Sequence, residues 1–255
     1  MSHPANSVEP GCERVNPYGD GRGKDAQVRD MFDNIAPAYD FMNRAMTLGI
    51  DRLWRAKAIK MIMPHKPERI LDIATGTADL AIEMHRRLHP LRGIIGVDLS
   101  EGMIEVGRRK INAAGASADI ELQVADCLAL PFADGCMDCV TAAFGVRNFA
   151  DLAAGYREMA RVTRPGGLLC VLELSTPRGI ITGPLYRLYT RTLIPAVGRL
   201  VSHDTRAYSY LPESIEAVPQ GKDMVALIES NGWVSACATP LTFGACTVYT
   251  ARRAG

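Results

Sequence analysis

The stretch Arg69-Ile-Leu-Asp-Ile-Ala-Thr-Gly-Thr-Ala-Asp-Leu80 decides the fold of this chain. Its first part, Arg69 to Ala74, is short, branched and apolar, which is typical of a buried parallel strand. A glycine-containing turn follows at residues 75–77, and from Asp79 the apolar residues recur at helical spacing. A strand, a tight turn and a helix N-terminus bring backbone N–H groups together, so the stretch predicts a cofactor-binding turn.

The carboxylate of Asp72 decides which cofactor is expected. It precedes the turn glycine, Gly76, by four residues and would repel the diphosphate of a dinucleotide. S-adenosylmethionine (SAM) carries an ammonium and a sulfonium and no phosphate, so an acid at this strand end suits it. The dinucleotide glycine pattern is also incomplete, because Ala78 and Ala81 follow Gly76. The alternative is that Asp72 only caps the turn.

Further along the chain, βα alternation predicts a Rossmann-like, doubly wound, mostly parallel sheet with an antiparallel edge hairpin. The expected strands are residues 93–98, 120–124, 139–144 and 168–174, with edge strands near 234–239 and 246–251. Helices are expected to begin near Gln27, Asp51, Ser100, Asp151 and Asp223, the second and third with Asp51 and Ser100 as N-caps. Tyr39–Asn43 is expected in a loop or short turn, and Arg164–Gly167 in a turn.

Acidic residues fall at the carboxyl ends of the strands, where ligands of such sheets bind. Asp98 can accept hydrogen bonds from both ribose hydroxyls of an adenosine ligand. Asp126 is placed to bind an adenine amino group, with the backbone N–H of Cys127 as donor to a ring nitrogen; a polar turn residue is the alternative for Asp126. Together with Asp72, these residues and the turn residues Gly76 and Thr77 form the predicted cofactor site.

Length and composition indicate a globular protein of one α/β domain. A length of 255 residues with 47% hydrophobic residues suits one α/β domain, and a net charge of +1 gives no argument for nucleic acid. Seven scattered cysteines favour a reducing compartment, and the single C-x-x-C at Cys136–Cys139 is not expected to bind metal. Residues 1–24 are rich in Pro, Gly, Asn and Ser and are expected to form a flexible tail before a single domain at 25–255.

The segment 178–206 interrupts the regular alternation. Apolar residues are interleaved there with Arg178, Arg187, Arg191, Arg199 and Arg206, against one acid, Asp204. Such a basic amphipathic segment suits an anionic membrane surface or the apolar tail of a lipid substrate. A lid helix with a solvated basic face is the alternative. The segment is too polar to span a bilayer.

Four blocks in order resemble the ubiquinone/menaquinone biosynthesis C-methyltransferases, a family of class I SAM-dependent methyltransferases. The blocks are Asp72–Asp79, Tyr39–Asn43, Phe144-Gly-Val-Arg-Asn148, and Arg161-Val-Thr-Arg-Pro-Gly-Gly with Leu172-Glu-Leu-Ser175; the resemblance covers about residues 27–250. It implies methyl transfer from SAM to a ring carbon of a prenylated quinol, with demethylmenaquinol as the expected acceptor. It is compatible with a cytoplasmic, membrane-peripheral enzyme and leaves a homodimer open.

The family's F-G-x-R-N block places Arg147 and Asn148 beside the acceptor. The resemblance implies that Arg147 stabilises a phenolate or holds a water that takes the proton, and that Asn148 orients the acceptor oxygen. An ion pair that braces the loop is the alternative for Arg147. His203 is a further candidate for proton transfer without an assigned place.

Three residues depart from the family's pattern. Asp51 stands where the family commonly has His, Ala78 where it has Gly, and Ala143 where a Ser contacts the cofactor. These departures leave open the identity of the catalytic base, as well as a non-catalytic SAM-binding relative or a methyltransferase with another lipophilic acceptor. A nucleotide-dependent oxidoreductase is the hypothesis from another enzyme class. Ring type and tail length of the quinol also stay open.

Overall fold

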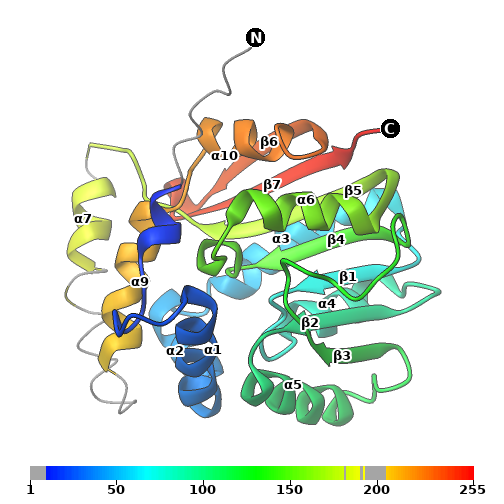
Figure 1. Ribbon diagram of the computed structural model, residues 1–255, viewed down its shortest axis with the longest axis horizontal. Coiled ribbons are helices and arrows are strands. Elements are labelled where there is room, and N and C mark those ends of the chain that lie inside the picture. Colours follow the sequence, from blue (N-terminus) through cyan, green and yellow to red (C-terminus); the bar gives the residue numbers. More distant parts are fainter. Residues whose placement is uncertain (1–9, 181, 190–191, 193–204) are drawn as a thin grey trace.

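A mixed β-sheet forms the centre of the molecule (Figure 1). The computed structural model describes residues 10–180, 182–189, 192 and 205–255, and within them the sheet has seven strands in the order β3-β2-β1-β4-β5-β7-β6. The strands are β1 (Ile70–Ile73), β2 (Ile94–Asp98), β3 (Ile120–Val124), β4 (Met137–Ala143), β5 (Thr163–Leu174), β6 (Trp233–Leu241) and β7 (Cys246–Arg253). Strands β1 to β5 run parallel, and β7 lies antiparallel between β5 and β6. The predicted doubly wound sheet with an antiparallel edge is confirmed.

Helices cover both faces of this sheet and one of its ends. The α-helices are α1 (Lys24–Ile35), α2 (Tyr39–Thr47), α3 (Asp51–Ile62), α4 (Asp79–Leu88), α5 (Glu101–Ala113), α6 (Leu152–Val162), α7 (Thr182–Leu188), α9 (Thr205–Ala217) and α10 (Lys222–Glu229). The 3₁₀ turns are η1 (Gly11–Arg14), η2 (Ala36–Ala38), η3 (Met63–His65), η4 (Val146–Asn148) and η6 (Thr242–Gly244). Helices α3, α4 and α5 pack on one face, and α6 and α10 on the other. Figure 1 shows α1, α2, α7 and α9 gathered beyond the carboxyl ends of the parallel strands.

Alternation along β1 divides the core into two layers, because successive side chains of a strand point to opposite faces. Ile70 packs with the cluster under α3, α4 and α5, whereas Leu71 and Ile73 pack with the cluster under α6 and α10. Both layers are continuous across neighbouring strands, and all four residues of β1 are buried. This strand therefore runs through the centre of the protein and fixes the position of the turn that follows it.

The starts of two helices are confirmed by their caps. Ser100 accepts a hydrogen bond from the backbone N–H of Met103, and Asp151 from that of Ala154. Asp51 differs from the prediction, because it is the first helical residue of α3 and makes no cap hydrogen bond. Its carboxylate bonds to side chains instead.

Two predicted turns are parts of regular elements. Tyr39–Asn43 forms the first part of helix α2, which buries Met42 and ends at Leu48 in a left-handed conformation. Arg164–Gly167 belongs to strand β5, where Gly166 has φ = +72° and the pairing register with β4 shifts. The proline and glycines that predicted a turn therefore produce an irregularity within the strand.

The N-terminal residues 10–24 differ from the flexible tail expected over residues 1–24. Cys12 in η1 is fully buried, and Lys24 begins α1 with only 7% of its surface exposed. Glu13 accepts a hydrogen bond from the backbone N–H of Leu152 at the start of α6. These contacts join residues far apart in sequence, so the polar composition of the segment did not reveal them.

The basic segment 178–206 is described only in part. Helix α7 and residues 189 and 192 lie within the described residues, whereas Arg191, Arg199, His203 and Asp204 lie outside them. None of the described helices is long and apolar enough to cross a membrane.

Candidate active site

The turn after β1 is held by the acid at the end of β2. The backbone N–H of Gly76, at φ = +55°, donates to Asp98 Oδ2 over 2.8 Å, and that of Ser100 donates to Oδ1 over 2.9 Å. Burial raises the pKa of Asp98, while these backbone donors lower it. The carboxylate is half-buried and lines a cavity beside the turn. A carboxylate in this position can accept hydrogen bonds from a diol, and the ribose contact expected for Asp98 stays a prediction.

Asp72 lies beneath the turn. Its carboxylate is 1% exposed and accepts hydrogen bonds from Thr141 Oγ1 at 2.6 Å and Thr75 Oγ1 at 2.7 Å. Burial raises its pKa to about 6, although both hydroxyls favour the charged form. Asp72 is not among the residues that line the cavity beside the turn, and its contact with a cofactor stays a prediction.

Thr77 joins the turn to helix α2. Its hydroxyl donates to Asp40 Oδ1 at 2.6 Å, and Lys110 Nζ donates to both Asp40 and Thr77, at 2.6 and 3.0 Å. Lys110 also contacts Asp79 at 2.5 Å. These hydrogen bonds connect helix α2 to the turn after β1. Thr77 therefore stabilises the contact between them, whether or not it also touches a ligand.

Asp126 and Cys127 differ in their surroundings. Asp126 Oδ1 accepts the backbone N–H of Leu128 at 2.8 Å, which is the turn role considered as the alternative. Cys127 lines the cavity beside Asp98, and so does Asp25 from α1. Burial raises the pKa of Asp25, and the nearby charge of Asp126 raises it further. Sequence reasoning missed Asp25, because no pattern near residue 25 marks it as part of a distant strand end.

The chemistry of this cavity fits SAM. The charged residues among its described lining are Asp25, Asp98 and Arg29, so carboxylates outnumber cations. Such a lining suits a cationic ligand and opposes a diphosphate. On the opposite wall, Gly145 lies so close to Ala74 that a Cβ at residue 145 would be 2.5 Å from the Ala74 side chain. The loop after β4 can therefore approach the turn after β1.

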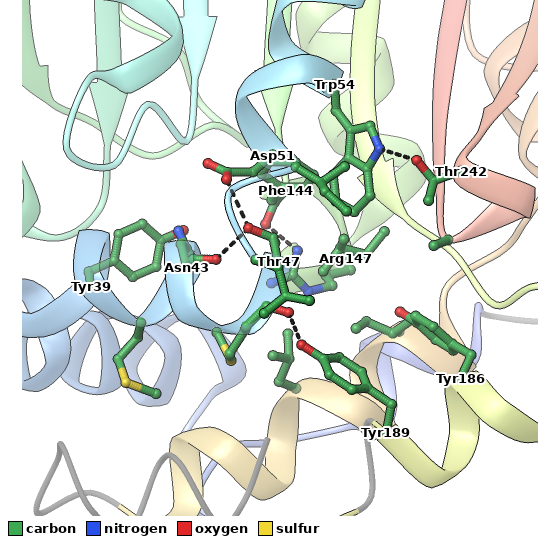
Figure 2. A pocket seen from close by; sticks show the side chains of 18 of the residues that line it. Tyr39, Asn43, Thr47, Asp51, Trp54, Phe144, Arg147, Tyr186, Tyr189 and Thr242 are labelled. Carbon is green, nitrogen blue, oxygen red and sulfur yellow. Dashed lines mark hydrogen bonds between the residues drawn. The ribbon is translucent and has the colours of Figure 1, made fainter. Parts of the chain in front are cut away.

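A larger cavity of about 510 Å³ adjoins the first and is almost entirely apolar (Figure 2). The two cavities share Phe32, Tyr39, Phe144 and Asn148 in their linings. Residues from α1, α2, α3, α7, α9, η4 and η6 line the larger cavity. Volumes of 300–1,000 Å³ with a few polar groups are typical of small-molecule sites. This cavity is the candidate acceptor site.

Arg147 lies in this cavity and also forms a buried ion pair. Arg147 Nη1 contacts Glu173 Oε1 at 2.8 Å and donates to the Phe144 carbonyl, and the Arg147 N–H donates to Glu173 Oε2 at 3.2 Å. Arg147 Nε is buried and has no hydrogen-bond partner within the described residues. In this position Arg147 can brace the loop through its ion pair with Glu173 and can also reach the acceptor cavity, so the two roles considered for it do not exclude each other. Glu173 stands in a block quoted from the sequence, yet it was not assigned there.

Tyrosines and Asn148 supply further polar groups. Asn148 Oδ1 accepts a hydrogen bond from Tyr210 at 3.0 Å. Tyr39, Tyr186 and Tyr189 line the same cavity, and burial raises the pKa of each. Tyr39 also lines the smaller cavity. Tyr39 had a signal in the sequence through the Tyr39–Asn43 block, and Tyr186 and Tyr189 through the segment 178–206, whereas Tyr210 had none.

The three departures from the family pattern occupy distinct places. Asp51 lines the acceptor cavity, and Ala143 lines the cofactor cavity. Ala78 is buried at φ = +65°, a conformation in which glycine is unstrained. Among the residues that the structure describes, no group of three or more His, Cys, Asp or Glu side chains could hold a metal ion.

Comparisons with known proteins match nearly the whole chain. The model of the ubiE/COQ5 methyltransferase family matches residues 21–253. Demethylmenaquinone methyltransferase of Bacteroides fragilis is 47% identical over 241 residues, which cover 94% of this chain and 98% of that protein. The ubiquinone/menaquinone biosynthesis C-methyltransferase UbiE of Geobacter sulfurreducens is 42% identical over 230 residues, which cover 90% of each.

A solved structure agrees with the fold. The SAM-dependent methyltransferase from Aquifex aeolicus superposes with a TM-score of 0.55 at 16% identity, covering 73% of this chain and 82% of that one. This family is incompatible with the nucleotide-dependent oxidoreductase considered above. The chain belongs to the ubiE/COQ5 methyltransferase family and is a SAM-dependent methyltransferase.

Proposed function

We propose that the protein methylates a ring carbon of demethylmenaquinol, a prenylated naphthoquinol. The observation that carries the proposal is the apolar cavity of about 510 Å³ that shares a wall with the cofactor cavity. An aromatic ring with an apolar tail matches its lining, and the relative of 47% identity is named for demethylmenaquinone. Asp98, Gly76, Thr77 and Cys127 would hold SAM, with Asp72 beneath the turn.

SAM, when bound, supplies a methyl group made electrophilic by its sulfonium. The Arg147 guanidinium in the acceptor cavity favours an ionised quinol oxygen, which makes the adjacent ring carbon nucleophilic. Asn148, held by Tyr210, presents its amide beside the cavity and orients that oxygen. The apolar wall excludes water, which strengthens both interactions. Such positioning and charge stabilisation are what a transfer between two bound reactants requires.

Methyl transfer to two soluble quinols tests the proposal. The enzyme, SAM and chemically reduced acceptors with short prenyl tails are combined, and the ring-methylated product is measured by mass spectrometry. We expect turnover of the naphthoquinol and a lower kcat/KM for the corresponding benzoquinol. Preference for the benzoquinol would change the assigned ring, and no transfer to either would reject a quinol acceptor.

We further propose that the mouth of the acceptor cavity meets the membrane surface that holds the quinol. Leu48 and Phe243 line the cavity, yet 75% and 84% of their surfaces are exposed. Arg44 on α2 and Arg52 on α3 are both exposed, and each lies four residues from Leu48 in the sequence. Apolar side chains beside cations suit an anionic bilayer surface. The basic segment 178–206 continues this pattern in sequence.

Sedimentation with anionic vesicles tests this contact. Leu48→Ser with Phe243→Ser should reduce the bound fraction at low salt, because the apolar anchors are lost. Leu91→Ser is the matched control, since Leu91 is also 85% exposed but follows α4, away from the acceptor cavity. Replacing Arg187, Arg191 and Arg199 by Gln tests the basic segment in the same way. Equal binding by all variants and the parent would reject membrane docking.

A further inference from the structure

The proposed quinol methylation needs a proton acceptor that Arg147 cannot supply. Replacing a ring C–H by C–CH₃ with a sulfonium donor releases one proton per turnover. The ring carbon becomes strongly nucleophilic only when the neighbouring hydroxyl loses its proton. A guanidinium stays protonated under these conditions, because its pKa exceeds about 12. Another group beside the acceptor must therefore take the hydroxyl proton.

Among the described residues that line the acceptor cavity, Asp51 is the only carboxylate. The other ionisable side chains of this lining are Arg147 and four tyrosines: Tyr39, Tyr186, Tyr189 and Tyr210. Burial raises the pKa of all four phenols, so they remain neutral and cannot accept a proton. Among the lining residues that the structure describes, Asp51 is therefore the one carboxylate that could take the proton.

The hydroxyl of Thr47 has one proton and two acceptors within reach. Thr47 Oγ1 lies 2.7 Å from the carbonyl oxygen of Asn43 and 2.8 Å from Asp51 Oδ1 (Figure 2). It can donate to only one of them at a time. When Asp51 carries a proton, Asp51 can donate to Thr47 while Thr47 donates to Asn43, and both contacts become hydrogen bonds. The carboxylate of Asp51 can therefore take up a proton while Thr47 keeps hydrogen bonds to both Asp51 and Asn43.

A neighbouring cation holds the carboxylate of Asp51 in position. Arg55, one turn later on α3, contacts Asp51 Oδ2 at 2.5 Å and Asp79 on α4 at 3.1 Å. Arg147 of η4 and Tyr39 of α2 line the same cavity as Asp51. Because Arg55 is shared with Asp79, it still has a carboxylate partner when Asp51 becomes neutral. Asp51 lines the cavity, and only 1% of its surface is exposed.

We infer that Asp51 is the catalytic base, taking the hydroxyl proton of the bound quinol onto its carboxylate while Thr47 positions it. The O–H bond of the quinol breaks and an O–H bond forms on Asp51, and the electron pair stays on the quinol oxygen, stabilised by Arg147. After the ring carbon has gained its methyl group, its C–H bond breaks and that proton is lost, while the quinol oxygen takes up a proton again. The net release is therefore one proton per turnover, and the carboxylate is restored when the proton on Asp51 passes to solvent. This assignment rests on the proposed quinol acceptor.

Asp51→Asn is the first test, because the amide keeps the shape but cannot accept the proton. We expect kcat with a short-tailed demethylmenaquinol to fall on the order of 10²–10³, which is the usual contribution of general base catalysis. SAM affinity should stay within about threefold. The rate of the variant should rise with pH, since an increasing fraction of the quinol ionises without enzyme help. Asp138→Asn is the matched control, because Asp138 binds Arg69 and Arg164 away from the cavity and should show the parent's rate and pH profile.

Asp51→His distinguishes a base from a structural anion. Imidazole accepts a proton at a reference pKa of about 6.5, compared with about 3.9 for aspartate. The variant should therefore be at least tenfold faster than Asp51→Asn, and the acid limb of its kcat/KM profile should move up by about two to three pH units. A folded Asp51→His as slow as Asp51→Asn, or an Asp51→Asn within threefold of the parent, would overturn the inference. Failure of the quinol proposal is visible separately, as absence of methyl transfer by the parent.

Discussion

The cofactor cavity and the acceptor cavity are adjacent but are built in different ways. The first lies at the ends of parallel strands, and its lining includes Gly76 in the turn after β1 and Asp98 at the end of β2. The second lies among helices and short turns from residues 31 to 245, and its wall is apolar apart from a few groups. The cofactor cavity thus depends on the backbone at the strand ends, whereas the adjacent acceptor cavity depends on how helices pack together. Substitutions should affect the two in separable ways.

Arg147→Ala should have the largest effect, because it acts on both stability and rate. Glu173 is 1% exposed and would keep only backbone N–H donors, so we expect unfolding free energy to fall by about 3–5 kcal/mol. Loss of the cation should lower kcat on the order of 10², while SAM affinity stays within about threefold. Chemical denaturation and single-turnover methyl transfer measure the two effects.

The double variant Arg147→Ala with Glu173→Gln separates these two roles. It removes the unpaired buried charge and should recover most of the lost stability without recovering the rate. If the rate returned together with stability, Arg147 would be a brace for the loop and not a participant in catalysis.

Asp98→Ala should act on the cofactor side alone. A charged acceptor for hydroxyl groups is worth about 1.5–3 kcal/mol, so SAM affinity should fall by about tenfold or more. The backbone N–H of Gly76 also loses its partner, which loosens the turn. Calorimetric titration with SAM measures the loss. Unchanged affinity in the folded variant would remove Asp98 from the cofactor site.

Asp72→Asn should stabilise the protein and weaken its cofactor binding. The pKa of Asp72 is raised to about 6 in the folded state, so its contribution to stability is present below about pH 4 and is lost as pH rises through 6. An amide between Thr75 and Thr141 avoids that loss. We expect a gain on the order of 2–3 kcal/mol at pH 7, with lower SAM affinity. A parent and variant whose stabilities run parallel from pH 4 to 7 would contradict this account.

Thr242→Val should have the smallest effect, on the packing of the acceptor side. Trp54 Nε1 donates to Thr242 Oγ1 at 2.8 Å, which joins α3 to η6 at the cavity. Losing one such hydrogen bond costs about 1 kcal/mol, measured by thermal unfolding, and SAM affinity should not change. Thr239→Val in β6 controls for loss of a hydroxyl elsewhere. An equal cost in both variants would show that the Trp54 contact adds nothing.

The fold around the turn after β1 could be predicted because its information is local, while the cofactor contacts stay predictions. Strand, turn and acid occur within residues 69–80, and Asp98 follows at the end of the next strand. For the acceptor side, the sequence offered the family blocks around Tyr39–Asn43 and at Arg147 and Asn148, and the segment 178–206 as a lid or tail-binding part. Tyr210 meets Asn148 from 62 residues away, and Thr242 meets Trp54 from 188 residues away. Periodicity within an element cannot reveal such pairs, because it describes which face is apolar and not what that face meets.

Local signals left two outcomes open in two places. Asp126 was expected either to bind adenine or to act as a polar turn residue; its Oδ1 accepts the N–H of Leu128, and the adenine contact stays a prediction. Tyr39–Asn43 follows Pro37 and was expected in a loop or short turn, yet it forms part of helix α2, which packs around Met42. For Tyr39–Asn43 the short-range pattern allowed two outcomes, and tertiary contacts selected one.

The buried ammonium of Lys24 has a practical consequence for where this domain can be cut. Lys24 Nζ donates to the carbonyl of Cys12 at 2.6 Å and to the carbonyl of Arg147 at 3.3 Å. The family model begins at residue 21, so a fragment trimmed to that boundary would keep every motif but lose Cys12 and Glu13. Turn η4, which carries Arg147, would then lose its contacts with η1, and Lys24 would lose the Cys12 carbonyl as a hydrogen-bond acceptor. Expression fragments should therefore include residue 10, even though the recognisable domain begins later.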